Sequence, residues 1–351
     1  FANSLRLRYA MRISDANPQK AQEEFEKALI ADGGIITSAV DDALIPYMDI
    51  AFSFGGESYS DYRRNALSQR LYGNDPLNNP SFICSTLYNQ LFNTGDPRFS
   101  AIIRFYFDKT MSSTSTEGRI DISEEVLAKD MAHPRDPGAF FYEPWPASYE
   151  SDLLKELQKT NPAIDKTTAD TETEPKLASN FLKGENPGVI ITSGEVNFLL
   201  AEAVLKGWNV SGSVEEYYRK GVRDAIDFLT NNYGCDAVTD TEFDKYMNNN
   251  SIGYTAEQKK ASINTQAWIL HLTNPLECWA NLRRSNYPQL KSPASYGFSQ
   301  VLTGGAEIPV RLCYPVLESS YNKKNYEEAL SRMGGNNSWN TPVWWDKNNV
   351  Q

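Results

Sequence analysis

Aromatic rings set between prolines are the residues of this chain best suited to holding a ligand. The stretch 133–149 contains four prolines and five rings. Sugars present C–H faces that stack on Trp and Tyr rings, while Asn, Arg and Asp side chains hydrogen-bond their hydroxyls. A proline-restrained backbone also loses little entropy on binding. We therefore predict a binding platform of Tyr142, Trp145 and Tyr149, with Tyr59 from a Gly-rich stretch as a neighbour. The alternative is that the loop folds back and buries its rings as a small satellite core.

The sequence offers no recognisable set of catalytic or metal-binding residues. His133 lies in a loop before Pro134 and His271 lies late on a helix, and no G-x-S-x-G nucleophile motif is present. Four scattered cysteines lack zinc spacing and are interpreted as buried thiols, with one long-range disulfide left open. The acidic stretch 236–244 lacks the central glycine of a calcium loop. We predict no catalytic residue, metal or cofactor, and a glycosidase-type pair of carboxylates stays open as an alternative.

Charge excludes nucleic acids and anionic lipid surfaces as partners, and hydropathy excludes a membrane-spanning helix. The 351 residues include 34 Lys and Arg against 45 Asp and Glu, which gives a formal net charge of −11. Nucleic acids and anionic lipid surfaces require a basic face, so neither is a predicted partner. The longest apolar runs are a few residues, far below the roughly 20 that span a bilayer.

Helical hairpins form the predicted scaffold. The first hairpin covers residues 1–31, and Asn17-Pro18 supplies the N-cap and the first helical proline of its second helix. A second hairpin runs from Thr192, which stands in capping-box relation to Glu195, to about residue 231. A third begins at residue 255 with a further capping box, and Asn274-Pro275 opens its second helix. These pairs resemble tetratricopeptide hairpins but do not recur at a steady period, because long inserts interrupt them.

The predicted fold is mainly α, with tetratricopeptide-like hairpins, long aromatic loop inserts and little β structure. We describe residues 1–351 as a single unit with three parts. They are a hairpin at 1–31, a loop-rich ligand-binding insert at 32–190, and hairpins with C-terminal motifs at 191–351.

Several motifs resemble those of SusD/RagB-like proteins, in the same order. Residues 189–203, which read VIITSGEVNFLLAEA, match the family's helix-opening motif, and Asp96-Pro97-Arg98 matches its mid-chain turn. Residues 275–284 are similar to its E-x-W-x-x-x-R-R motif, and 308–315 with 344–346 resemble its C-terminal end. The matched residues are helix caps, an arginine pair and terminal tryptophans, so we expect them to hold the fold together, not to touch ligand.

The resemblance implies a lipoprotein on the extracellular face of the outer membrane. Such a protein captures oligosaccharides and delivers them to a SusC-like TonB-dependent transporter. Uptake of peptides by a RagB-type protein is the first alternative. A glycoside-acting enzyme and an adaptor that binds peptides along its hairpin groove are the others.

The resemblance also implies that membrane contact is made only through an N-terminal lipid anchor that this sequence does not include. If further helices normally precede residue 1, the exposed face of residues 1–31 should be apolar through Leu5, Phe25 and Leu29. The fragment should then be less stable than the longer protein.

Overall fold

A computed structural model describes residues 1–50, 63–72, 82–108, 119–136, 173–249, 259–292 and 308–347, with Lys155, Lys159 and Ser295 as isolated positions. Helices dominate these residues and the strands are short pairs, which confirms the predicted mainly α fold. Two compact units divide the chain. Unit 1 consists of Phe1–Ala43, Ile191–Val222 and Tyr254–Gln351, and unit 2 of Leu44–Ile190 and Arg223–Gly253. The single unit with internal boundaries at 31 and 190 stays a prediction.

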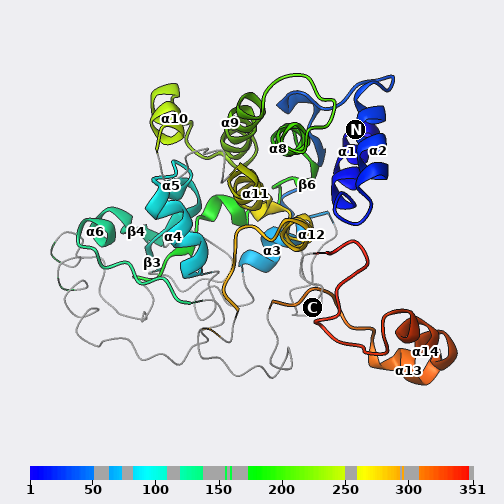
Figure 1. The fold of residues 1–351 in the computed structure, drawn as a ribbon. Helices are drawn as coiled ribbons and strands as arrows, with labels where there is room; N and C mark the ends of the chain where they lie inside the picture. The colour runs from blue at the N-terminus through cyan, green and yellow to red at the C-terminus, as the bar shows by residue number, and fades with distance from the viewer. Residues whose placement is uncertain are drawn as a thin grey trace. The chain divides into compact units, whose positions relative to one another are not determined.

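Unit 1 is assembled from three separate stretches of the chain (Figure 1). Its helices are α1 (Ala2–Arg12), α2 (Pro18–Leu29), η1 (Ala39–Asp41), α8 (Ser193–Leu205), the first turns of α9 (Val214–Tyr233), α11 (Lys259–Leu270), η3 (His271–Thr273), α12 (Pro275–Ser285), α13 (Val316–Tyr321) and α14 (Lys323–Arg332). The pairs α1–α2 and α11–α12 pack as hairpins. Residues 250–258, which include the predicted start of the third hairpin, lie outside the described residues.

The first hairpin follows its local sequence signals closely. The Asn17 side chain accepts a hydrogen bond from the Lys20 backbone N–H at 3.2 Å, and Pro18 occupies the first helical position of α2. Helix α12 begins in the same way, because the Asn274 side chain accepts from the Glu277 N–H in front of a proline. Both caps were predicted, since each depends on residues three positions apart.

Phe25 is the anchor of the first hairpin. It is completely buried and meets Trp208 edge to face, with 5.1 Å between the ring centroids. The expectation that Phe25 belongs to an exposed apolar face was therefore wrong, because Trp208 from a later part of unit 1 covers it. Leu5 and Leu29 are partly buried as well.

Helix α8 is the central helix of unit 1, since it packs against both α1 and α11. Thr192 caps it by accepting from the Glu195 N–H at 3.3 Å. The predicted capping box is only half formed, because the Glu195 side chain turns to Arg8 of α1 instead of back to Thr192. Burial on several sides explains why α8 carries apolar residues all around its axis.

Unit 2 combines short helices with two small antiparallel sheets. The helices are α3 (Ala66–Tyr72), α4 (Ser85–Thr94), α5 (Phe99–Ile102), α6 (Ser123–Ala128), η2 (Ser179–Leu182), the rest of α9, and α10 (Asp240–Met247). The sheets pair β2 (Ile103–Arg104) with β5 (Lys176–Leu177) and β3 (Tyr106–Asp108) with β4 (Arg119–Asp121). A third pair joins β1 (Ala43–Ile45) to β6 (Gly188–Ile191). The chain passes directly from helix α5 into strands β2 and β3.

The Asp96-Pro97-Arg98 turn forms a buried hydrogen-bond network in unit 2. Asp96 Oδ1 accepts from the Arg98 backbone N–H and Nε, both at 2.9 Å, and Oδ2 accepts from Arg98 Nη2 at 2.6 Å. Tyr246 of α10 donates its hydroxyl to the same Oδ2 at 2.7 Å. The turn therefore fixes α10 against the start of α5, in agreement with the structural role expected for this motif.

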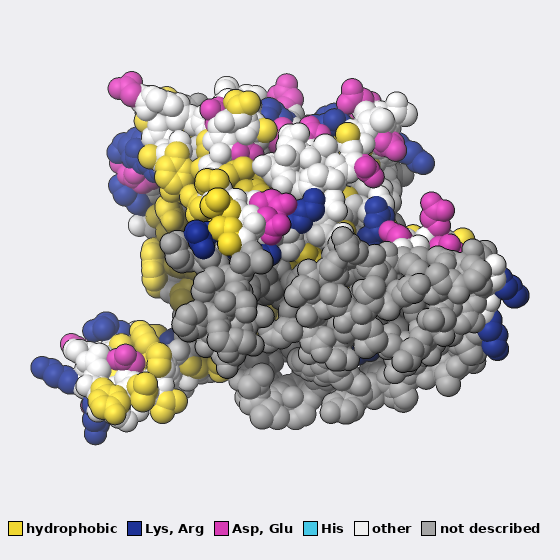
Figure 2. Space-filling model, turned by 180° about the vertical axis from the view of Figure 1, so that it is seen from behind, with side chains coloured by type: hydrophobic (Ala, Val, Ile, Leu, Met, Phe, Trp, Pro, Cys, Tyr) yellow, Lys and Arg dark blue, Asp and Glu magenta, His cyan; other side chains and the backbone are white. Residues whose placement is uncertain are grey.

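The C-terminal hairpin α13–α14 buries none of its side chains. Figure 2 shows hydrophobic side chains gathered on this part of the molecule. They include Val316, Leu317 and Tyr321, which are between 65% and 86% exposed. Glu and Lys side chains at exposed positions of α14 surround them with both signs of charge.

Gly221 offers a test of how closely the helices of unit 1 pack. A Cβ at this position of α9 would lie 2.7 Å from two ring carbons of Phe198. Alanine should strengthen the helix by about 1 kcal/mol, yet we expect Gly221→Ala to lower the free energy of unfolding by roughly 1–2 kcal/mol, because the clash outweighs this gain. Thermal melts would measure the change. Phe198→Leu should reduce the penalty in a double-mutant cycle, and a stabilised Gly221→Ala variant would contradict the expected clash.

Candidate functional site

The four predicted ligand-binding residues lie outside the described residues. Tyr59 belongs to the stretch 51–62, and Tyr142, Trp145 and Tyr149 belong to 137–150. The binding platform therefore stays a prediction. Each unit contains a cavity lined by described residues. The first cavity is small and filled by ion-paired side chains, and the second is larger and open to solvent.

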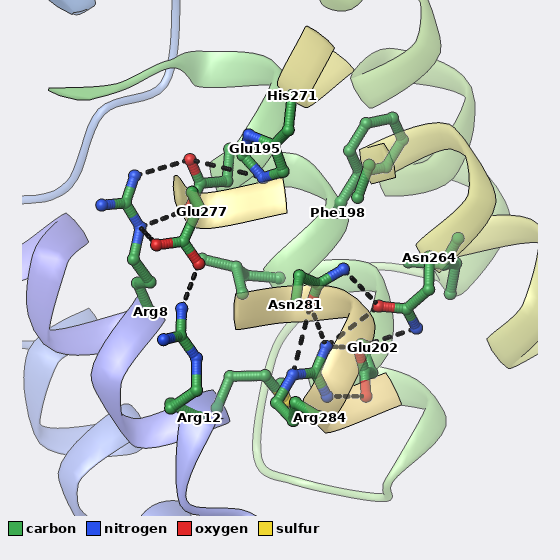
Figure 3. A pocket seen from close by; sticks show the side chains of 14 residues that line it. Arg8, Arg12, Glu195, Phe198, Glu202, Asn264, His271, Glu277, Asn281 and Arg284 are labelled. Carbon is green, nitrogen blue, oxygen red and sulfur yellow. Dashed lines mark hydrogen bonds and ion pairs between the residues drawn. The ribbon is translucent and has the colours of Figure 1, made fainter. Parts of the chain in front are cut away.

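The first cavity, in unit 1, is lined by buried charges that neutralise one another (Figure 3). Arg8 of α1 makes a two-pronged pair with Glu195 of α8, at 2.5 Å from Nε and 2.7 Å from Nη2. Arg12, one turn further along α1, pairs with Glu277 of α12. His271 completes the group, with Nε2 at 3.9 Å from a Glu195 oxygen. We call these five residues the charged core.

A further ion pair beside the charged core joins α8 to α12. Glu202 accepts two hydrogen bonds from Arg284, both at 2.7 Å, and each side chain is no more than 3% exposed. Two amides complete the pair, because Arg284 Nη2 also donates to Asn264 Oδ1 at 3.0 Å and to Asn281 Oδ1 at 2.8 Å. The Arg284 guanidinium is thus also bound by one amide from α11 and one from α12.

The protonation states follow from these contacts. Burial alone would raise the pKa of Glu202, but the Arg284 guanidinium outweighs it and lowers that pKa to about 2. Burial likewise opposes ionisation of Glu277, and Arg12 and Arg8 more than compensate, so its pKa is also lowered. For His271 burial dominates and lowers the pKa, despite the nearby Glu195. Glu202 and Glu277 are therefore ionised at pH 7, and His271 is neutral.

The unit 1 cavity cannot accommodate a ligand. Its volume is about 20 Å³, enough for one water molecule. Both oxygens of Glu195 and of Glu202 accept from a guanidinium, and the space beside them leaves no room for a substrate. The structural interpretation of His271 therefore agrees with its burial in this cluster.

Arg283 and Trp345 also hold the C-terminal segment against α12. Arg283 lies over the Trp279 ring at 4.0 Å and over the Trp345 ring at 4.8 Å, and it donates to the Val310 carbonyl at 2.8 Å. These contacts agree with the structural role expected for the arginine pair. Trp344 differs, because it is 67% exposed.

The second cavity, in unit 2, is larger and open to solvent. Its volume is about 380 Å³. Side chains from four segments line it: Arg104 of β2, Asp121 of β4, Asn180 of η2, and Cys235 and Asp236 after α9. We call it the polar cavity. Sequence reasoning missed these residues, since they are spread along the chain from Arg104 to Asp236 and share no motif or spacing.

No metal centre accompanies either cavity. Across the residues that the structure describes, no group of three or more His, Cys, Asp or Glu side chains could hold a metal ion. The four cysteines are free thiols, so the disulfide left open by the sequence is not formed. Burial is the main cause that raises the pKa of the Cys278 thiol to about 12, which makes it unreactive at pH 7.

The motifs and the helical architecture together match one protein family. The family model described as "Starch-binding associating with outer membrane" matches residues 1–315. The chain belongs to the SusD-like family. Within the described part of this SusD-like chain, no helix is both long and apolar enough to cross a bilayer.

Solved structures place this SusD-like chain among similar proteins. A Bacteroidetes SusD-like protein is 43% identical, with a TM-score of 0.86 over 100% of this chain and 69% of the other. A chitin-binding protein is 28% identical, with a TM-score of 0.69 over 98% and 63%. A SusD homologue from Bacteroides fragilis is 19% identical, with a TM-score of 0.68 over 98% and 66%, and shares the fold. The chain thus spans less than two thirds of the last two. No curated protein matches it.

The buried Glu202–Arg284 pair predicts a specific pH dependence. Glu202 has an ordinary pKa near 4.5 and a folded pKa of about 2, so its contribution is complete above about pH 4.5 and is lost as the pH falls toward 2. Glu202→Gln leaves Arg284 buried without a counter-charge, and we expect it to lower the free energy of unfolding by about 3–5 kcal/mol at pH 7. Denaturant titrations at pH 7 and pH 3 would measure both effects.

The difference between Glu202→Gln and wild type should shrink at pH 3. Glu328→Gln is the matched control, because Glu328 forms only an exposed pair with Arg332 at 3.9 Å. That control should change stability by less than about 1 kcal/mol. A Glu202→Gln protein as stable as wild type at pH 7 would contradict the assigned role of the pair.

Proposed function

We propose that this chain captures oligosaccharides at the outer surface of the outer membrane and delivers them to a SusC-like TonB-dependent transporter. The observation that carries the proposal is the family match over residues 1–315, in a family described as starch-binding and associated with the outer membrane. The relative that is 28% identical is described as a chitin-binding protein, which supports a glycan as ligand. A lipid anchor on the complete protein would hold it at the membrane.

Binding without turnover is part of the proposal. The buried carboxylates of Glu195, Glu202 and Glu277 in unit 1 are engaged with arginines, so they are not placed to act on a glycosidic bond. In the proposed role, the rings of Tyr142, Trp145 and Tyr149, with Tyr59, stack on sugar faces while nearby polar groups accept and donate hydrogen bonds. Such a protein holds its ligand reversibly, as delivery to a transporter requires.

Trp145→Ala tests the proposed aromatic platform. Loss of a stacked aromatic contact typically costs about 2 kcal/mol, so we expect roughly thirtyfold weaker binding of maltooligosaccharides or chitooligosaccharides, with nearly unchanged melting temperature. Isothermal titration calorimetry and thermal melts would measure the two quantities. Trp344→Ala is the matched control, because Trp344 is an exposed tryptophan of unit 1. A large loss of stability with intact affinity would show that Trp145 belongs to a core.

A polysaccharide panel separates the proposed function from its alternatives. New reducing ends that disappear on replacing one Asp or Glu would identify an enzyme. Binding of peptides with no affinity for any glycan would identify a peptide-uptake protein or an adaptor. Neither result is expected if the chain is a glycan-binding protein.

Association with a transporter is the second testable part of the proposal. The net charge of −11 disfavours direct binding to anionic lipid, so contact with the membrane should be through protein and anchor. We expect purification of the lipid-anchored, full-length protein from outer membranes to recover a large TonB-dependent transporter in stoichiometric amount. Recovery of the protein alone would contradict the delivery step.

A further inference from the structure

The walls of the polar cavity are fixed by backbone hydrogen bonds. Arg104 is opposite Lys176 in the β2–β5 pair, and the Ala178 N–H donates to the Ile102 carbonyl at 2.8 Å. On the facing side, Asn180 Nδ2 donates to the Gly234 carbonyl at 2.9 Å, which ties η2 to the segment after α9. A ligand entering here therefore meets a surface that is already ordered, and little further conformational entropy is lost.

The charged groups of the polar cavity keep hydrogen-bonding capacity for a ligand. Arg104 Nε is 3.5 Å from Asp121 Oδ2, which is long for a hydrogen bond, and the side chains are 34% and 59% exposed. Asp121 is held in place through its other oxygen, which accepts from the Ser123 N–H at 2.9 Å. Asp236 is exposed, and among the described residues no group donates to its carboxylate. Ligand hydroxyls can bind to these groups in place of solvent.

Among the described residues that line this cavity, no aromatic ring is exposed for stacking. Tyr106 lines it, but its ring is buried and the Lys176 ammonium lies over it, at 4.9 Å from the ring centroid. Recognition must therefore come from hydrogen bonds. Carboxylates and the Asn180 amide oxygen accept from hydroxyls, and a guanidinium donates to hydroxyl oxygens, which together suit a ligand carrying adjacent hydroxyl groups.

Size and charge narrow the class of ligand. A cavity of about 380 Å³ is near the lower end of the range of about 300–1,000 Å³ for small-molecule sites, so it suits one or two sugar rings, not a longer chain. Two carboxylates and one guanidinium line the cavity, and the Lys176 ammonium lies over the Tyr106 ring, so opposite charges balance and no excess of positive charge favours an acidic sugar. A neutral sugar meets both conditions.

We infer that the polar cavity is a second sugar site, where Arg104 donates hydrogen bonds to one neutral sugar unit and Asp121, Asn180 Oδ1 and Asp236 accept hydrogen bonds from it. The inference rests on the proposed glycan-binding function and adds to it a site built from residues other than the predicted aromatic platform. A chain that also engages such a site would bind with higher avidity than its stacked segment alone allows.

Alanine methyl groups provide a local probe of this site. Ala101 and Ala178 line the polar cavity, whereas Ala10 and Ala21 are buried in unit 1. With ¹³C-methyl alanine in the full chain, titration with D-glucose and with N-acetyl-D-glucosamine should shift the Ala101 and Ala178 resonances and leave those of Ala10 and Ala21 in place. Glucuronate should shift them less at equal concentration.

Asp236→Ala should weaken this binding at least tenfold, since a charge-assisted hydrogen bond is lost. Arg104→Met should act in the same direction. Asp240→Ala is the matched control, because Asp240 is an exposed acid of the same unit outside the cavity and should leave the affinity unchanged. Unshifted Ala101 and Ala178 methyls, equal affinity in Asp236→Ala, or a stronger response to glucuronate would each overturn the inference.

Failure of the inference can be told apart from failure of the proposed function. If oligosaccharides bind in a manner that depends on Trp145 while neither monosaccharide shifts Ala101 or Ala178, the proposed function stands and the second site is rejected. If neither oligosaccharides nor monosaccharides bind, the proposed function is rejected together with the site.

Discussion

Mutual neutralisation of buried charge is the constraint on which unit 1 depends. A guanidinium or a carboxylate placed alone in an interior loses several kcal/mol of hydration, so each can be buried only when its partner is present at the right distance. Arg8 and Arg12 on α1, and Arg284 on α12, find their partners on other helices. The positions of α1, α8 and α12 are therefore coupled, because a shift of one helix would leave a charge unpaired. Asn264 extends the same constraint to α11.

The two cavities show how polar groups can either support a fold or remain available to a ligand. In the unit 1 cavity, each arginine and glutamate of the three buried ion pairs is bound by a neighbouring side chain, and the remaining space holds one water molecule. In unit 2 the Arg104–Asp121 contact is long and Asp236 faces solvent. Similar residue types thus serve different purposes, and burial decides which. Counting acids in the sequence could not make this distinction.

Sequence reasoning succeeded where structure depends on neighbours along the chain. The caps at Asn17 and Asn274 require residues only three positions apart, so they were predicted with their helices. It failed where a distant residue competes for the same side chain. Glu195 has the spacing of a capping box, but Arg8, 187 positions earlier, offers a stronger partner. The polar cavity was missed for a related reason, since short strands with no periodicity bring its residues together.

The long separation of the ion-paired residues has a consequence for biosynthesis. Arg12 leaves the ribosome 265 residues before Glu277, which is about 13 to 50 s at roughly 5–20 residues per second. Until α8 and α12 are synthesised, the guanidinium groups of α1 are hydrated by water, because their partners Glu195 and Glu277 are not yet present. Residues 44–253, which include all of unit 2, are synthesised before α12 is complete. The order of translation thus gives unit 2 the opportunity to fold while unit 1 still awaits its last charged helix.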